Sequence, residues 1–117
     1  GEWDVALHAF QQGLARDPVN PELLNSVAVT RVQMGGFEAA LPVLQGLVQL
    51  HPDRSDYRVN LAVTLLNLGE LDAAADACRK VLVAEPDHAQ ARALMDQIER
   101  EVKGRSAPVD RPNTASE

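Results

Sequence analysis

The sequence contains few aromatic residues, which make up 3% of its 117 residues. Apolar residues nevertheless reach 45%, so alanine, valine and leucine must form the hydrophobic core. Small aliphatic side chains suit helices that pack at close range. The length is that of one domain.

Cysteine, long apolar runs and clustered basic residues are also scarce or absent. The single cysteine, Cys78, excludes an internal disulfide. No apolar run approaches the ~20 residues of a membrane span, and no signal peptide is visible. The net charge is −6 and Lys and Arg do not cluster. We therefore expect no membrane span and no nucleic acid as a partner, while a basic protein partner is compatible with this charge.

The sequence does contain a repeat with a period of 34 residues. Five positions recur at this interval: Gly1, Gly35 and Gly69; Ala6, Ala40 and Ala74; Pro18, Pro52 and Pro86; Trp3, Phe37 and Leu71; Phe10, Leu44 and Cys78. A fixed period of this size is typical of stacked copies of one small unit. Arrays of this kind mostly bind other proteins.

Proline and glycine mark the ends of the expected helices. A proline ends an apolar segment in each repeat, because it disfavours helix at the residue before it. Asn20 offers a capping side chain, and Pro21 follows it at the first helical position. We predict six helices and no strand, with helices at 3–16, 21–34, 37–50, 55–68, 71–84 and 88–103. The short turns between them make each repeat a helical hairpin.

With these residues in place, the sequence resembles the tetratricopeptide repeat family. The matching positions in residues 21–54 are Leu24, Val27, Ala28, Gly35, Phe37, Ala40, Leu44, Leu47 and Pro52. In residues 55–88 they are Leu61, Ala62, Leu65, Gly69, Leu71, Ala74, Cys78, Val81 and Pro86. The resemblance implies an all-α fold, a right-handed α-solenoid of antiparallel helical hairpins. Arg31 and Arg58 depart from the family pattern, which has large inward-packed side chains there.

The repeats divide the chain into an array, residues 1–103, and a tail, residues 104–117. The array comprises a half repeat (1–20), two repeats (21–54 and 55–88) and a capping helix (89–103). The half repeat matches only the second helix of a unit, so we expect the chain to be the C-terminal part of a longer array. The tail contains Pro108 and Pro112 and almost no large apolar residue, which predicts disorder.

In tetratricopeptide arrays, one face of the first helix of each repeat lines a concave groove that binds ligands. The resemblance therefore implies a protein-binding groove here, lined by Asn25, Val29, Gln33, Asp56, Val59, Asn60, Val63, Leu66 and Asn67. Val59, Val63 and Leu66 are spaced i, i+4, i+7 and form the predicted apolar floor. Packing between repeats is an alternative role for this stripe, and for Val32 and Leu66 it is an equal one. The resemblance places Glu22 and Asp56 at the groove edge.

Some co-chaperones of this family hold the carboxylate of a chaperone C-terminus with Lys, Asn and Arg side chains. Asn60 occupies a position similar to one of the clamp asparagines. Asp56 and Asn60, however, stand where the basic residues would be needed, and Asp56 would repel a carboxylate. We predict a groove without a carboxylate clamp.

Residues with catalytic or metal-binding chemistry do not converge in the sequence. His8, His51 and His88 fall in three different repeat registers and lack metal-ligand spacing. Cys78 stands in a column of apolar residues, which is typical of a buried side chain rather than a nucleophile. We predict no enzyme, no cofactor and no metal.

The two ends of the array differ. The last helix has one apolar stripe and an otherwise polar surface, as a capping helix requires. The first helix presents Trp3, Leu7 and Phe10 on a face without its hairpin partner, a candidate edge for self-association.

Three functions remain open. The first is a protein–protein interaction scaffold that binds a peptide or helix in the groove. The second is a self-association element that forms a homodimer through the edge or the groove. The third alternative is a non-catalytic appendage of an upstream enzyme. The sequence leaves the partner and the compartment open, with bacterial cytoplasm and periplasm both compatible.

Overall fold

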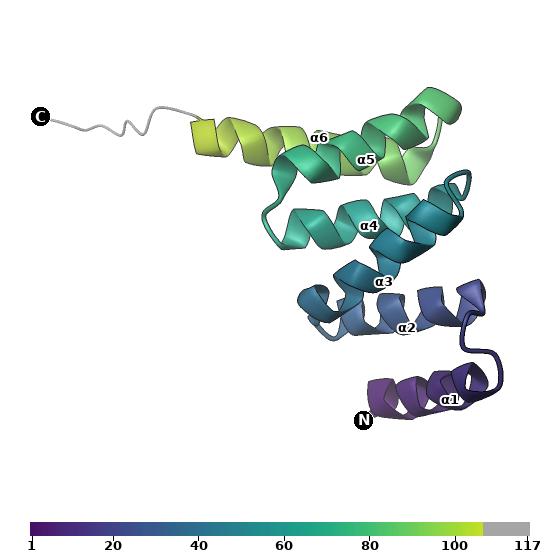
Figure 1. Cartoon of the computed structure of the whole chain (residues 1–117). Helices are drawn as coiled ribbons and strands as arrows, with labels where there is room; N and C mark the ends of the chain where they lie inside the picture. The colour runs from purple at the N-terminus through teal and green to yellow at the C-terminus, as the bar shows by residue number, and fades with distance from the viewer. Residues whose placement is uncertain (107–117) are drawn as a thin grey trace, which may run out of the picture.

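The computed structural model describes residues 1–106 of the chain and consists of a stack of helices (Figure 1). The helices are α1 (Glu2–Arg16), α2 (Pro21–Gln33), α3 (Phe37–Leu50), α4 (Ser55–Asn67), α5 (Leu71–Ala84) and α6 (Ala89–Ser106). Residues 1–106 contain no strand. The all-α helical-repeat solenoid predicted from the sequence is confirmed.

The observed helix bounds follow the predicted ones closely except at the end of α6. That helix was expected to stop at residue 103 but continues through Ser106. Its last turn is held by Arg105, whose Nη1 donates a hydrogen bond to the Gly69 carbonyl oxygen at 3.2 Å. The predicted tail therefore does not begin at Gly104, and the rest of that prediction, residues 107–117, lies outside the described residues.

Glycine ends the first helix of both complete repeats. Gly35 and Gly69 have φ angles of +83° and +81°, a left-handed conformation that only glycine adopts readily. After α2 the Gly36 N–H donates to the Arg31 carbonyl oxygen at 2.7 Å, and the Gly35 N–H donates to that of Val32 at 3.0 Å. This pair of bonds is the Schellman motif, which satisfies the last carbonyl groups of a helix and turns the chain into the next one.

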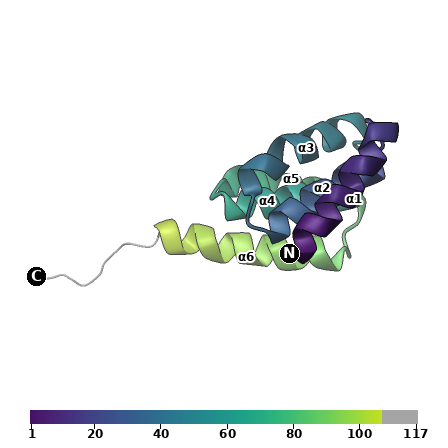
Figure 2. The same ribbon diagram turned by 90° about the horizontal axis from the view of Figure 1, so that it is seen from below.

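The first helices of successive repeats form the inner layer of the stack, since α2 contacts α4 and α4 contacts α6. Viewed from below, α3 lies on one side of α2 and α4, while α6, the last helix of the inner layer, is displaced to the other side (Figure 2). Ala40 and Ala74 are completely buried, as expected where the two helices of a hairpin approach most closely. A larger side chain at these positions would separate the helices.

The arginine that departs from the family pattern in α4 has a polar role. Arg58 is half-buried, and its Nη1 donates a hydrogen bond of 2.7 Å to the Pro52 carbonyl oxygen. Its counterpart in α2 is Leu24, which packs against the core cluster formed by α2, α3 and Tyr57. The arginine therefore caps the preceding turn instead of filling the core.

Candidate functional site

A hollow of about 240 Å³ lies between α2 and α4. Its lining consists of Val29, Val32 and Gln33 from α2 and Asn60 and Val63 from α4. The three valines are half-buried, while Gln33 is exposed. The volume is below the ~300–1,000 Å³ of pockets that enclose small molecules, so the hollow suits a single side chain of a polypeptide. None of the lining side chains is charged.

Two half-buried amides connect α2 and α4 beside the hollow. The Asn60 Nδ2 donates a hydrogen bond of 3.0 Å to the Asn25 Oδ1. A primary amide offers two donor hydrogens and an oxygen with two acceptor sites. Within residues 1–106, the Asn25 Nδ2 and the Asn60 Oδ1 have no hydrogen-bonding partner. This one bond uses one donor hydrogen and one acceptor site of the two amides, so the Asn25 Nδ2 and the Asn60 Oδ1 keep their full hydrogen-bonding capacity.

The acidic residues expected at the groove edge are both bound by Arg54, in the turn before α4. The Arg54 Nη1 lies 3.2 Å from the Glu22 Oε2, and its Nη2 lies 2.8 Å from the Asp56 Oδ2. The guanidinium also stacks over the Tyr57 ring, 4.3 Å from its centroid. Its hydrogen bonds lower the pKa of both carboxyl groups. One positive charge thus offsets part of the acidity at the edge.

The structure brings together most of the residues predicted for the groove. Val29, Gln33, Asn60 and Val63 line the hollow, and Asn25 borders it through its hydrogen bond to Asn60. Asn67 is exposed and donates to the carbonyl oxygen of Val63 in its own helix, at 2.9 Å. Its amide nitrogen is therefore already used.

Val59 does not belong to this surface. Its side chain is 4% exposed and packs with Val81 and Ala91 in a core cluster between α4, α5 and α6. The i, i+4, i+7 spacing predicts one groove floor, but α5 and α6 cover its N-terminal residue, Val59. Leu66, at the other end of the stripe, is half-buried against the core cluster of α4, α5 and α6.

Val32 is the lining residue that the sequence assigned equally to packing between repeats. It lies one turn after Val29, so the two side chains share a face of α2. Its side chain both packs against the core and lines the hollow. Its i, i+3 spacing from Val29 is the sequence feature from which its place in the lining of the hollow could be predicted.

The α1 edge is less covered than the rest of the array. The structure buries no residue of α1, and Trp3 is 42% exposed. Leu7 and Phe10 are half-buried. By contrast, Leu44 and Cys78, which share the register of Phe10, are completely buried. The difference arises because α1 packs only against α2, whereas α3 and α5 each have helices on two sides.

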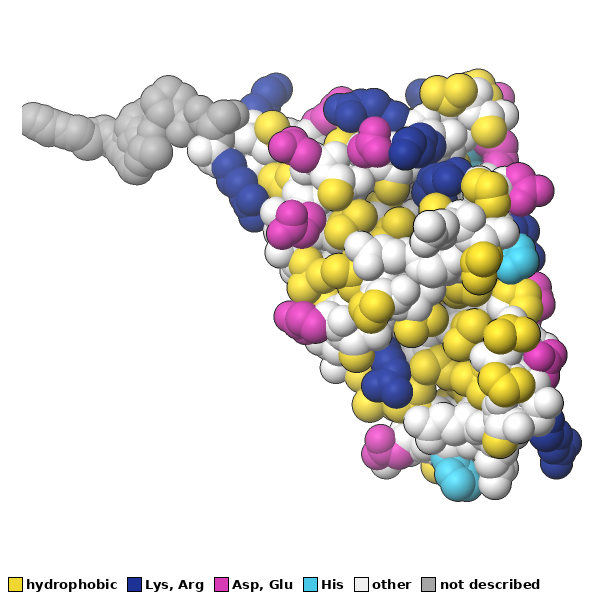
Figure 3. Space-filling view, in the orientation of Figure 1, with side chains coloured by type: hydrophobic (Ala, Val, Ile, Leu, Met, Phe, Trp, Pro, Cys, Tyr) yellow, Lys and Arg dark blue, Asp and Glu magenta, His cyan; other side chains and the backbone are white. Residues whose placement is uncertain are grey.

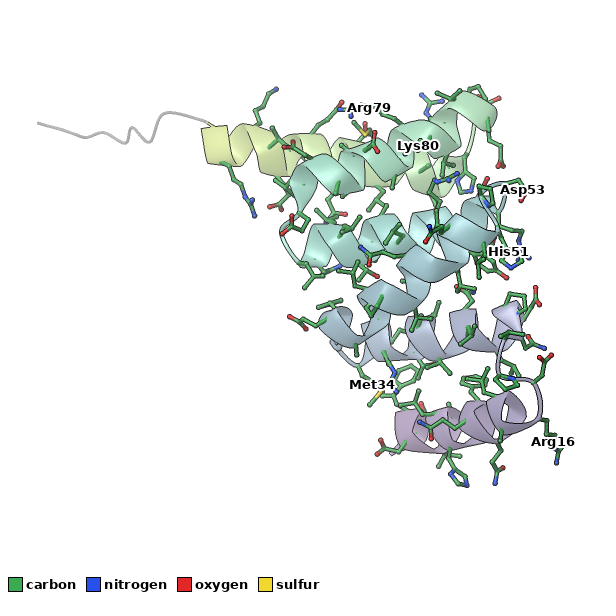
Figure 4. All side chains as sticks on the ribbon, viewed as in Figure 1. Arg16, Met34, His51, Asp53, Arg79 and Lys80 are labelled. Carbon is green, nitrogen blue, oxygen red and sulfur yellow. The ribbon has the colours of Figure 1, made fainter. Side chains whose placement is uncertain are left out.

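Charged residues gather at the opposite end of the stack. In the view of Figure 3, basic and acidic side chains lie over α5 and α6, and apolar side chains are more prominent around α3. Arg79 and Lys80 of α5 point outward from this end (Figure 4). The capping role of α6 stays a prediction.

The side chains of Cys78, His51 and His88 take part in packing or in contacts at turns and helix ends. Cys78 is completely buried, and burial raises the pKa of its thiol. His51, at the turn after α3 (Figure 4), packs edge-on against Tyr57 with ring centroids 6.0 Å apart. His88 accepts a hydrogen bond at its Nδ1 from the Ala91 N–H at 3.2 Å. These contacts stabilise turns and helix ends.

Residues 1–106 hold no group of three or more His, Cys, Asp or Glu side chains able to bind a metal ion. Among the same residues, no helix combines the length and apolarity needed to cross a membrane.

Several solved structures are similar to this chain. MamA of AMB-1 is 24% identical with a TM-score of 0.77 over 87% of the chain, which spans 60% of the MamA chain. YrrB, described as a TPR protein with an unusual peptide-binding site, is 25% identical with a TM-score of 0.79, covering 90% of this chain and 54% of YrrB. The first TPR of Spaghetti (RPAP3), bound to the HSP90 peptide SRMEEVD, is 22% identical with a TM-score of 0.80, covering 87% and 81%.

The sequence was also compared with protein families and with curated proteins. No curated protein matches it. The family model for the tetratricopeptide repeat matches residues 31–98, more than half of the chain. The match includes α4 and α5 entirely and most of the groove residues. The chain therefore belongs to the tetratricopeptide repeat family.

Proposed function

We propose that this chain is a non-catalytic protein–protein interaction module, a scaffold that binds a peptide or helical segment in the groove between α2 and α4. The observation that carries the proposal is the hollow itself. Three half-buried valines form its floor, and beside it lie the Asn25 Nδ2 and the Asn60 Oδ1, which have no hydrogen-bonding partner within residues 1–106. An apolar floor with a few polar groups is the usual character of a peptide-recognition surface.

Two of the similar proteins, YrrB and Spaghetti, support the proposal by analogy. YrrB is described as having a peptide-binding site, and the Spaghetti repeat is bound to a peptide. The groove of this chain would work without a carboxylate clamp, because its lining is uncharged and Arg54 is engaged by Glu22 and Asp56. The buried thiol of Cys78 is consistent with a role that involves no catalysis.

The test begins with a displayed library of random peptides, selected on the wild-type chain. Val63→Glu places a charge in the hollow, and Val83→Glu is the matched control because Val83 is 85% exposed on α5. Selected peptides should lose at least about tenfold in affinity for Val63→Glu, since burying an unpaired charge is costly. They should bind Val83→Glu as they bind wild type.

Circular dichroism must show that both variants are folded. Because Val63 also packs against the core, Gln33→Glu at the exposed rim serves as a second variant with less effect on folding. A library that yields no binder, or binders indifferent to both groove variants, would overturn the proposal.

A second candidate function is self-association through α1, and the exposure of Trp3 favours it. If α1 of one copy packs antiparallel on α1 of another, Glu2 and Asp4 of one helix face Arg16 of the other. Sedimentation should then show a homodimer that Phe10→Glu converts to a monomer. A wild-type chain that stays monomeric at high concentration would exclude this function. The alternative of an appendage to an enzyme stays a prediction.

A further inference from the structure

A second hollow, of about 310 Å³, lies between α5 and α6, at the end of the stack opposite to α1 (Figure 1). Its lining combines an apolar floor with a rim of two acidic and two basic side chains: Ala75, Met95, Ile98 and Val102, with Asp72, Arg79, Glu99 and Lys103. Among residues 1–106, α6 contacts only α4 and α5. No helix of the described part of the chain therefore covers this hollow.

The same repeat positions hold a helix one repeat earlier. Three lining residues, moved back by one period of 34, correspond to leucines: Ala75 to Leu41, Met95 to Leu61 and Glu99 to Leu65. These leucines lie in, or pack against, the core cluster that contains the buried face of α5. Because α5 is the second helix of its hairpin, the equivalent seat between α5 and α6 is suited to the second helix of a repeat.

The helix α1 is of that type. Three of its residues share the columns of residues on the buried face of α5: Trp3 with Leu71, Ala6 with Ala74, and Phe10 with Cys78. Within residues 1–106, however, α1 contacts only α2 and buries no residue. The helix α6 begins one period after α4 and is therefore a first helix. The described chain thus holds a second helix without its first at one end, and a first helix without its second at the other.

The charges at the ends of these two helices are complementary. In a helical hairpin, the first turn of the second helix lies beside the last turn of the first helix, because the two are antiparallel and joined by a short turn. The first turn of α1 carries Glu2 and Asp4, and the last turn of α6 carries Lys103 and Arg105. Opposite charges across an interface fix its orientation. They favour α1 in the hairpin direction on α6.

Two acidic residues of α6 make this contact weaker than a hairpin within the chain. Asp96 and Glu99 stand where α4 has Ala62 and Leu65, whose side chains are 0% and 7% exposed. An indole N–H donates hydrogen bonds, so Trp3, in the first turn of α1, supplies a donor for Glu99. Asp96 loses water without such a donor, which opposes docking. A reversible association is therefore expected.

We propose that α1 of a second copy of this chain docks in the hollow between α5 and α6 and completes the hairpin of α6 between copies. One copy contributes α1 and the other contributes α5 and α6, so the interface is heterologous and copies add head to tail. This inference rests on the second candidate function, self-association through α1, and gives α1 a different surface from that in the α1–α1 dimer. It leaves the groove between α2 and α4 free for a ligand.

The test uses the difference between the two surfaces. Trp3→Glu disables the docking helix and Val102→Glu blocks the hollow, and both positions are 42% exposed, so both variants should fold. In sedimentation, wild type should associate increasingly with concentration, while each variant alone stays monomeric. An equimolar mixture of the two variants should form a dimer and nothing larger, because each keeps the surface that the other has lost. Val83→Glu, at an 85% exposed position of α5, is the control and should associate as wild type does.

Charge variants test the orientation. Lys103→Glu should weaken association about threefold, and adding Glu2→Lys should restore it. Asp96→Ala, which installs the alanine of the preceding repeat, should tighten association about fivefold or more.

Two outcomes would overturn the inference. A wild-type chain that stays monomeric at high concentration removes both this inference and self-association through α1. If Val102→Glu still dimerises while Trp3→Glu does not, α1 binds α1, so the inference falls and the second candidate function stands. Peptide binding in the groove is measured separately with Val63→Glu, which should leave association unchanged.

Discussion

The two junctions between successive first helices, α2–α4 and α4–α6, use the same repeat positions in opposite ways. At the α4–α6 junction Val59 packs with Val81 and Ala91 in a closed apolar cluster. At the α2–α4 junction the equivalent of Val59 is Asn25, and the two helices are joined there by an amide hydrogen bond beside a hollow. The comparison shows that local sequence changes open a hollow between successive repeats on an unchanged backbone plan.

The surface of the two junctions differs as well. Arg54 ties α4 to Glu22 of α2 at the first junction. One repeat later the same position holds His88, which accepts a hydrogen bond from the Ala91 N–H and so caps its own helix. The first junction therefore adds an ion pair between repeats to the apolar cluster that holds Tyr57 and Ala28, whereas at the second junction His88 bonds within its own helix.

The largest expected effect comes from giving the closed junction the polar residue of the open one. Val59→Asn places an amide at a position that is 4% exposed. The surrounding side chains are apolar, so the side-chain amide would have no hydrogen-bonding partner among them. We expect a loss of about 2–3 kcal/mol in the free energy of unfolding, the range for a buried unsatisfied polar group. Urea unfolding followed by circular dichroism measures it, and Asn25→Val is the control at the equivalent position. A loss below about 0.5 kcal/mol would show that the α4–α6 junction is not closed.

Smaller losses are expected when an alanine replaces the glycine after α2 or α4. Gly35 and Gly69 both have positive φ, so each change should cost about 1–2 kcal/mol. A Cβ on Gly35 meets no atom, but one on Gly69 would lie 3.2 Å from the Arg105 Nη2. Gly69→Ala should therefore be the more destabilising of the two, because it also disturbs the contact that holds α6. Equal midpoints in urea would contradict a role for Arg105 in closing the second junction.

Most of the fold could be predicted from the sequence because it repeats. The columns at Ala40 and Ala74 and the glycines at 35 and 69 fix the helix spacing and the turns, and these depend on local rules. The end of α6 was missed because it depends on Arg105 reaching the carbonyl of Gly69, a contact between residues far apart in the chain. The residues of α6 themselves carry no sequence signal from which this contact with Gly69 could be predicted.

The lining of the hollow between α2 and α4 could be predicted only in part, again because it depends on contacts between repeats. Periodicity identifies the face of a helix but not which neighbour covers it, so Val59 and Val63 looked equivalent on α4. The positions of α5 and α6 separate them, because Val59 is buried against Val81 and Ala91 while Val63 lines the hollow. The pairing of Arg54 with Glu22 likewise joins two repeats, and no spacing within one repeat predicts it. Interactions across repeats were therefore the part that sequence reasoning could not reach.

A third change gives the α2–α4 junction the apolar residues that stand at the equivalent positions one repeat later, Val59 and Leu94. Asn25→Val/Asn60→Leu replaces both partners of the amide hydrogen bond with apolar residues, which is neutral or stabilising when the shapes fit. We expect a gain of up to about 1 kcal/mol in the free energy of unfolding. A loss of more than about 1 kcal/mol would mean that the amides are required for packing, and the contrast between the junctions would then be structural rather than functional.

The smallest expected effect concerns the charges at the open junction. Because Arg54 lowers the pKa of Glu22 and Asp56 in the folded protein, the unfolded chain binds more protons than the folded one as the pH falls. The stability from these pairs is thus complete above the ordinary carboxyl pKa and is lost as the pH falls through the lowered values. Arg54→Met should show a shallower loss of stability between about pH 6 and about pH 3 than wild type.

Arg58→Met is the matched control, because it removes a nearby arginine that donates to the Pro52 carbonyl oxygen, which does not titrate. Its pH dependence should follow that of wild type. High salt should reduce the difference between wild type and Arg54→Met, since all three charged groups are partly exposed to solvent. If Arg54→Met keeps the wild-type slope at low salt, the arginine does not control the two carboxyl groups, and apolar contacts of Tyr57 alone must hold the edge of the open junction.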